Sequence, residues 1–399
     1  MTDAPADDDR APDLPHSLAD SAARPAAHPS AHPDPLAWLL ADDGPDAADP
    51  AVRWQALRDL SDAAPVEVAG VRARASIEGW GDALLARQEA SGDFGGVGDE
   101  GERWRYDLYS LIQLRLLRPD PADARIRSAI ELVRDRVTWG PWHAESPFFS
   151  GETEPCINGN ALAIGAYFSG ASESADGLPI IEGTISEPLA ARLLGEQLPD
   201  GGWNCEAPDG SAVSSFHSTI CVLDGLLEYE LAGGVQSADA IAARHRAEQY
   251  LLERRLFLGL RSGEVVDAAM THFEFPYRWR YDVLRGLDHF VRAYPGGAAT
   301  VGGGAAAGGG AAVVGGAASG DGEVDARLAP ALDLLERRRG LDGRWTLGLA
   351  PGGEGADVDA VRHFGEEHEY QTPMESGGGA PSRWNTFRAL RALRWAGRG

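Results

Sequence analysis

Residues 195–230 read GEQLPDGGWNCEAPDGSAVSSFHSTICVLDGLLEYE, and their pattern organises the rest of the chain. The stretch ends one predicted helix, makes a turn of the form Gln-x-x-x-Gly-x-Trp at Gln197, Gly201 and Trp203, and begins another helix near Phe216. A glutamine amide can bond the exposed carbonyls at a helix end, and Gly201 and Gly202 permit positive φ. Because one helix pair cannot bury its own apolar face, the unit is expected to recur.

The turn does recur, and a second motif repeats with it. Further copies of the turn are Gln88-x-x-x-Gly92-x-Phe94 and the weaker Arg339-x-x-x-Gly343-x-Trp345. The pentapeptide Arg-Trp-Arg-Tyr-Asp occurs at residues 103–107 and again at 278–282. Repeats of this kind predict an array of helical hairpins.

Composition narrows the class of protein. The chain has 399 residues, is 43% hydrophobic and carries a net charge of −25, with arginine as its basic residue and no lysine. A nucleic-acid partner is therefore not expected, because phosphate binding needs positive charge. Three cysteines are too few for a disulfide framework and indicate a reducing compartment. The first residues lack the apolar core of a signal peptide, and no stretch has the length of a membrane span, so a cytoplasmic location is expected.

Apolar periodicity predicts that helices alternate with turns after a disordered tail at residues 1–33. The expected helices are 51–60, 73–88, one from 104, one after Pro121, 155–168, 186–198, 216–231, 240–257, 279–291, 326–339 and 384–396. Those beginning near 53, 104, 156, 216, 279 and 384 are apolar, and the others are amphipathic. Buried inner helices with solvated outer partners predict an all-α fold, a single (α/α)6 toroid over residues 34–399, interrupted by a flexible Gly/Ala-rich insertion at 296–323.

Helical hairpins closed by Gln-x-x-x-Gly-x-Trp turns resemble the terpenoid cyclase and protein prenyltransferase superfamily, the α/α toroids. The resemblance covers roughly residues 36–399. Squalene-type cyclases carry an Asp-x-Asp-Asp acid motif, and the nearest match here, Asp357-Val358-Asp359-Ala360, lacks the last aspartate. The resemblance to cyclases is therefore architectural and does not carry over their catalytic acid.

The resemblance to prenyltransferase β subunits implies a zinc site. That family uses Asp-x-Cys at the start of one inner helix and a histidine at the start of another. Here Glu154-Pro155-Cys156 and His217 take those places, with glutamate replacing aspartate. Thiolate, imidazole and carboxylate suit tetrahedral Zn²⁺. Cys221 is the reserve ligand and Cys205 a weaker one; alternatively, Cys156 is a small buried apolar residue and His217 bonds at a helix start.

Successive inner helices are expected to run parallel, so their N-termini would lie together at one end of the barrel. Other residues are candidates for a site there. In the two pentapeptides, Arg103, Trp104, Arg278, Trp279 and Tyr281 are candidates for substrate binding. Arginine donates hydrogen bonds in pairs, which suits a diphosphate. Asp107 and Asp282 are candidate catalytic acids or helix caps, and a purely structural role for both copies is the alternative. His363 and His368 with Glu366 and Glu367 are a further metal-binding candidate at the rim.

These features predict an enzyme that acts on an isoprenoid or similar apolar substrate in the barrel cavity, with zinc-assisted prenyl transfer as the reaction. A squalene cyclase-like enzyme with a non-standard acid is one alternative, and a non-catalytic binding toroid is another. The sequence indicates no protein partner, although protein prenyl transfer itself needs a partner subunit.

Overall fold

The computed structural model describes residues 34–44, 46–95, 103–169, 186–295, 324–348, 374–375 and 379–399. The described residues from Asp34 onward belong to one compact unit. The predicted tail (1–33), the Gly/Ala-rich insertion (296–323), the partial acid motif (357–360) and the His363–His368 cluster lie outside the described residues.

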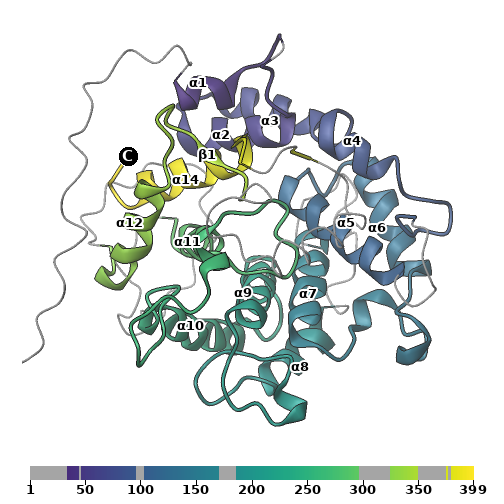
Figure 1. The fold of residues 1–399 in the computed structure, drawn as a ribbon. Coiled ribbons are helices and arrows are strands. Elements are labelled where there is room, and N and C mark those ends of the chain that lie inside the picture. The colour runs from purple at the N-terminus through teal and green to yellow at the C-terminus, as the bar shows by residue number, and fades with distance from the viewer. Residues whose placement is uncertain are drawn as a thin grey trace, which may run out of the picture. The chain divides into compact units, whose positions relative to one another are not determined.

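The described chain is mostly helical with very little strand, as expected for an all-α protein (Figure 1). The α-helices are α1 (Pro35–Leu40), α2 (Pro50–Leu60), α3 (Pro65–Arg74), α4 (Gly79–Leu85), α5 (Arg103–Leu117), α6 (Ala124–Arg136), α7 (Pro155–Ser169), α8 (Glu187–Gly195), α9 (Phe216–Leu231), α10 (Ser237–Glu253), α11 (Val283–Ala293), α12 (Ala329–Arg337) and α14 (Arg383–Trp395). Short 3₁₀ helices are η1 (Pro141–His143), η2 (Phe148–Ser150), η4 (Ala207–Asp209), η5 (Ala268–Thr271) and η6 (Ala326–Leu328). Strands β1 (Trp345–Thr346) and β2 (Pro381–Ser382) pair antiparallel, with Trp345 opposite Ser382.

Several predicted helix boundaries differ from the structure, and two of the differences have a clear cause. The helix expected at 73–88 is not continuous in the structure: α3 ends at Arg74 and α4 begins at Gly79. Gly79 has φ +58° and lies so close to Asp49 that a Cβ would meet its carboxylate at 2.1 Å. The helix expected from 279 begins only at Val283, because Arg278 has φ +51° and the Asp282 side chain caps the helix start by accepting from Arg285 N.

The glutamines of the repeated turns bond to backbone carbonyls, as the sequence predicts. The Gln197 amide donates to Gly201 O at 2.7 Å and to Ala243 O at 2.8 Å. Gln88 donates in the same way to Gly92 O and Ala129 O, both at 2.9 Å. Each amide therefore joins its own turn to a neighbouring helix, α6 for Gln88 and α10 for Gln197.

The aromatic residue of each turn is fixed to the helix that follows. Trp203 is buried, and its indole donates to Leu193 O at 2.8 Å, while its backbone N–H donates to Thr219 Oγ1 at 3.1 Å. Trp345 makes the equivalent bonds, to Leu335 O at 2.8 Å and to the Thr386 hydroxyl at 3.1 Å. Gly201 has φ +98°, whereas Gly202 has no positive φ and instead lies where a Cβ would meet Thr219 Oγ1 at 2.4 Å.

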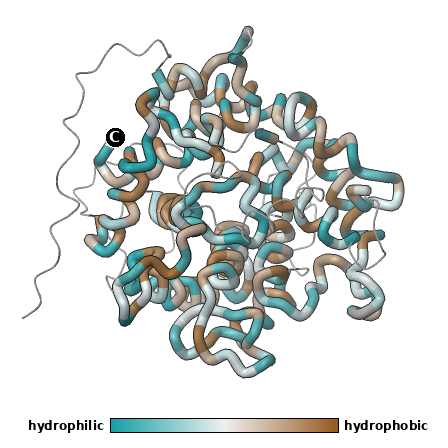
Figure 2. The backbone as a smooth tube through the Cα atoms, in the orientation of Figure 1, coloured by the Kyte–Doolittle hydropathy of each residue, from teal (hydrophilic) through white to brown (hydrophobic). Residues whose placement is uncertain are grey.

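Burial separates two kinds of helix. From Pro155 to Phe168 every residue of α7 is buried, and α9 is buried from Ser218 to Tyr229. By contrast α6, α8 and α12 bury one face, and the chain alternates between hydrophobic and hydrophilic residues along such helices (Figure 2). Within the described residues, no helix combines the length and apolar character needed to cross a bilayer.

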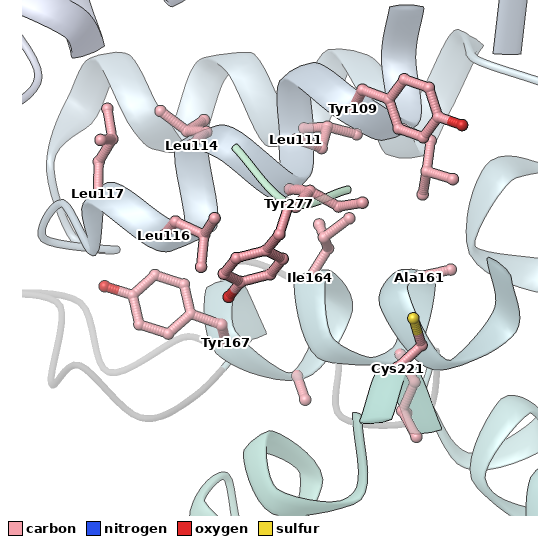
Figure 3. Close-up of a cluster of buried hydrophobic side chains, with 14 of the residues drawn as sticks. Tyr109, Leu111, Leu114, Leu116, Leu117, Ala161, Ile164, Tyr167, Cys221 and Tyr277 are labelled. Carbon is pink, nitrogen blue, oxygen red and sulfur yellow. The ribbon is translucent and has the colours of Figure 1, made fainter. Parts of the chain in front are cut away.

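The buried helices contact one another in sequence order. α7 packs on α5 and α9, α9 on α11, α11 on α14, and α14 on α2. The circuit returns to α5 because Trp54 Nε1 and Gln55 Nε2 of α2 donate to the carbonyls of Leu117 and Leu116, at 3.1 and 3.3 Å. Figure 3 shows the apolar cluster where α5 faces α7.

The tightest crossing is between α7 and α9. Two glycines face each other there, Gly159 on α7 and Gly225 on α9. A Cβ on Gly225 would lie 2.5 Å from Gly159 O, and one on Gly159 would lie 2.5 Å from Cys221 O. The two backbones therefore touch, and a side chain at either position would separate them.

Candidate metal centre

One group of metal-binding side chains gathers at the start of α7. Within the described residues, Glu154, Cys156 and Cys205 each offer a ligand atom, and these atoms all lie within 4.8 Å of one another. The two sulfurs are 3.0 Å apart, and Cys156 Sγ lies 3.4 Å from Glu154 Oε2. One zinc ion holds thiolates at about 2.3 Å and carboxylate oxygens at about 2.0–2.2 Å. A group of this width fits one ion after small side-chain rotations.

Two elements far apart in the sequence supply these ligands. Cys156 lies in the first turn of α7, and Glu154 immediately precedes that helix. Cys205 follows the repeated turn, two residues after the anchored Trp203. Its backbone N–H donates to Ser218 Oγ of α9 at 3.2 Å, which fixes the loop against the helix. The repeat turn therefore carries Cys205 to the start of α7.

A pocket of about 540 Å³ opens beside this group. Its apolar wall includes Trp104 and Trp139, whose ring centres are 5.9 Å apart, and Ile157. The other lining residues are His143, Glu152, Thr153, Glu154, Cys205, Pro208 and Asp209. The pocket thus combines indole surface with carboxylates and a thiol, a composition that suits an apolar molecule held next to a cation.

The two cysteines differ in acidity. The hydrogen bond shared with Cys205 raises the pKa of Cys156 well above its usual value, and burial adds to this effect. The same hydrogen bond lowers the pKa of Cys205, with the Ser218 hydroxyl acting in the same direction. Cys205 is therefore the sulfur on which a negative charge is better stabilised.

Glu152 and His143 form a second titratable pair on the pocket wall. Glu152 Oε2 lies 3.2 Å from His143 Nε2, and Glu152 Oε1 accepts the backbone N–H of Glu154. Burial raises the pKa of the Glu152 carboxyl. The pair can hold a proton beside the metal-binding group, a feature that the sequence analysis missed.

The structure does not bring His217 into the group of ligands. Its Nδ1 accepts the backbone N–H of Tyr281 at 2.9 Å, and its ring edge faces Trp279. Burial lowers the pKa of His217 to about 4, with Arg280 acting in the same direction, so the ring is neutral. The neutral ring then carries its proton on Nε2, and neither nitrogen has a free lone pair for a metal. The alternative interpretation, a histidine that bonds at a helix start, describes this residue better.

Cys221, the reserve ligand in the sequence analysis, also lies away from the group. It is fully buried, and its sulfur is 3.2 Å from Trp279 O. Figure 3 shows it within the apolar cluster near Ala161 of α7. Cys205, the weaker candidate, is the cysteine that meets Cys156.

The two identical pentapeptides adopt different structures. Residues 103–107 are the start of α5, whereas 278–282 precede α11. Among the five substrate-binding candidates, Trp104 lines the pocket. Trp279 packs on His217, and Tyr281 donates its hydroxyl to Leu256 O at 2.6 Å. Arg103 is exposed, and Arg278 is buried.

Both candidate catalytic aspartates accept backbone hydrogen bonds. Asp107 Oδ1 accepts Phe94 N at 2.8 Å, the bond that Thr219 and Thr386 make in the other turns. Asp282 accepts Arg285 N at 2.7 Å and Glu274 N at 3.2 Å. Burial raises the pKa of Asp107 to about 7 and also raises that of Asp282. Their contacts are those of caps and turn anchors.

Comparison with known proteins identifies no relative that would extend this picture: no family model matches the chain, and no curated protein matches it.

Proposed function

We propose that this chain is a zinc-dependent enzyme, built as a single (α/α)6 toroid, that acts on an isoprenoid or similar apolar substrate. The observation that carries the proposal is the meeting of two cysteine sulfurs and one carboxylate beside a pocket of about 540 Å³, whose lining includes Glu154 and Cys205 but not Cys156. Zinc bound by three protein ligands keeps a fourth position for substrate or water, which is typical of a catalytic site.

Helix contacts support the toroid. Helices α2, α5, α7, α9, α11 and α14 contact one another in a closed circuit, and α3, α6, α8, α10 and α12 follow them in the chain. This is the alternation of buried and one-sided helices that the repeated turns predict.

Glu154, Cys156 and Cys205 would hold the ion. When bound, zinc would lower the pKa of a coordinated thiol or water and so generate a nucleophile near neutral pH. Zinc binding requires the thiolate form of both cysteines, so it would reverse the raised pKa of Cys156. The Glu152–His143 pair is placed to accept or return a proton on the pocket wall, because both residues line the same pocket as Glu154.

The pocket lining favours a neutral apolar substrate. Trp104, Trp139 and Ile157 provide apolar contact, and the charged side chains of the described lining, Glu152, Glu154 and Asp209, are acidic. A diphosphate would be repelled there, because like charges in a partly buried site disfavour each other. Binding of a neutral isoprenoid, such as an alcohol or a thioether, therefore fits the pocket better than binding of a prenyl diphosphate.

Metal analysis and ligand titration test the proposal. Protein purified without chelators should contain one zinc per chain, and Cys156→Ser and Cys205→Ser should each lose it. Farnesol, a neutral isoprenoid, should quench the tryptophan fluorescence saturably, and Trp104→Ala should weaken this binding. Zinc retained in the double cysteine variant would refute the metal site, and tighter binding of farnesyl diphosphate than of farnesol would refute the substrate argument.

A non-catalytic binding toroid is the second candidate. Buried ion pairs join helices of the circuit to one another, such as Asp224 of α9 and Arg285 of α11 at 2.9 Å. A protein whose interior is filled in this way can present its surface for binding without using a central cavity. Absence of zinc together with unchanged farnesol binding in Trp104→Ala would favour this candidate.

A further inference from the structure

Around the buried face of α9, arginine side chains outnumber the carboxylates that they contact. Among the described residues, four arginines share two acidic side chains of α9, Asp224 and Glu228. The contacts are Arg285–Asp224 at 2.9 Å, Arg115–Glu228 at 3.2 Å, Arg115–Asp224 at 3.6 Å, Arg118–Glu228 at 2.7 Å, Arg292–Asp224 at 3.2 Å, and Arg292–Glu228. Burial alone would raise the pKa of Glu228, but Arg118, Arg292 and Arg115 lower it to about 2. Both acids are therefore ionised, and positive charge remains in excess.

Arg388 of α14 adds unsatisfied hydrogen-bond donors to this interior. Its side chain is 1% exposed, and none of its three nitrogens has a hydrogen-bond partner in the described part of the chain. The nearest carboxylate oxygen, Asp288 Oδ1, is 3.8 Å from Nε and is already bonded to Arg391. A guanidinium is always charged in proteins, and the carboxylates of Asp288 and Asp282 are near this one, but its buried N–H groups have no acceptor among the described residues.

The ring of Tyr277 lies close to the guanidinium groups of several of these arginines. The guanidinium carbons of Arg285 and Arg388 lie 4.1 and 5.1 Å from the centre of the Tyr277 ring. Burial raises the pKa of Tyr277, and the charges of Arg285, Arg115 and Arg388 oppose that rise, so all three arginines are near it. Figure 3 shows Tyr277 between side chains of α5 and α7, such as Leu116 and Ile164.

The other two arginines near Tyr277 also have unused donors. Arg115 Nε and Nη2 and Arg285 Nε are buried without a hydrogen-bond partner among the described residues. A ring face attracts a cation but does not accept the in-plane N–H groups that remain. Ordered water could accept those hydrogens, but it would leave the excess charge unbalanced.

We propose that Arg388 binds a small inorganic anion of chloride size beside Tyr277, with Arg285 and Arg115 as neighbouring donors. The ion balances the charge and accepts the N–H groups that the protein leaves unpaired. The site is separate from the Glu154–Cys156–Cys205 group and does not depend on zinc.

Thermal unfolding at constant ionic strength tests this proposal, with sodium gluconate replaced stepwise by sodium chloride. The Tm of the wild-type protein should rise along a saturating curve, by about 2 °C when chloride reaches ten times its Kd. Arg388→Gln removes the charge and most of the donors, so its Tm should be independent of chloride. Arg338→Gln is the matched control: Arg338 is exposed and already donates to Thr271 Oγ1 at 3.0 Å, so this variant should keep the full response.

A second measurement does not depend on a variant that folds. Wild-type crystals soaked in sodium bromide should show an anomalous peak within hydrogen-bond distance of Arg388. A flat Tm in the wild-type protein, an unchanged chloride response in Arg388→Gln, or bromide confined to other positions would each overturn the proposal. Failure of zinc binding would refute the proposed function and leave this result unaffected.

Discussion

The sulfur atoms of Cys156 and Cys205 lie 3.0 Å apart although the two residues are 49 positions apart in the chain. Cys156 begins a buried helix, and Cys205 reaches it from the loop after a repeated turn. At this separation the two sulfurs can bind one metal ion after a small side-chain rotation, or can react with each other to form a disulfide.

Mild oxidation should join these two cysteines when metal is absent. Treatment of chelator-stripped protein with hydrogen peroxide should convert the two thiols to one disulfide, with reduction of the peroxide to two waters. Peptide mapping should find Cys156 linked to Cys205, and added zinc should protect both. The control is Cys221, which is buried and should remain a free thiol. A disulfide that includes Cys221 would contradict the geometry described here.

Trp203→Ala should destabilise the fold without a specific effect on the pocket. The indole is fully buried and bonded to Leu193 O, so its loss should cost about 3–5 kcal/mol of unfolding free energy. Chemical denaturation followed by circular dichroism measures the change. Trp104→Ala is the matched control, because Trp104 is half-buried and lines the pocket. A Trp203→Ala protein of wild-type stability would refute the structural role of the turn.

Asp107 should make stability fall as pH rises from about 4 to about 7. Burial raises its pKa in the folded protein from 3.8 to about 7, so the folded state binds this proton more tightly than the unfolded state does. The contribution is complete below the unfolded pKa and is lost as pH rises through the folded one. Asp107→Thr places at this position the residue type found at Thr219 and Thr386 of the other turns. The Tm of this variant minus that of the wild type should increase as the pH rises. A constant difference in Tm between pH 4 and pH 8 would contradict the assignment.

Gly225→Ala should weaken the packing of α7 against α9. The added methyl group would lie 2.5 Å from Gly159 O, and such overpacking typically costs about 1–3 kcal/mol. Urea denaturation measures the loss. Gly195→Ala is the matched control, since a Cβ there meets nothing within 4 Å and should leave stability nearly unchanged. Equal stability of the two variants would show that the crossing can relax at no cost.

The sequence predicts the helices best where the signal is repeated or continuous. The glutamine turns and the apolar runs of α7 and α9 lie where their patterns indicate, because periodic burial and helix-end hydrogen bonding are local properties. The break before Gly79 is not predicted, because the contact that holds the next residue, the Trp80 N–H donating to Asp49 Oδ2 at 2.7 Å, comes from a part of the chain distant in sequence.

In the candidate site, too, residues in local sequence patterns are predicted, whereas residues placed by tertiary contacts are not. Glu154 and Cys156 are predicted from the resemblance to prenyltransferase β subunits, because they match an Asp-x-Cys pattern at the start of a buried helix. Cys205 was ranked low because its position depends on how a loop folds over that helix, anchored by Ser218. His217 was expected to bind metal, but a backbone N–H from Tyr281 occupies its nitrogen, and no sequence pattern records such a contact.

The crossing of Gly159 and Gly225 also sets a dimension far from itself. Cys156 stands one helical turn before Gly159 on α7, and Ser218, which holds the Cys205 loop, stands two turns before Gly225 on α9. The distance between the two sulfurs therefore depends on how closely α7 and α9 approach each other where Gly159 and Gly225 touch. A larger residue at the crossing would push the two helices apart and widen that distance, so a substitution that contacts none of the three candidate ligands would alter how well they fit a metal ion.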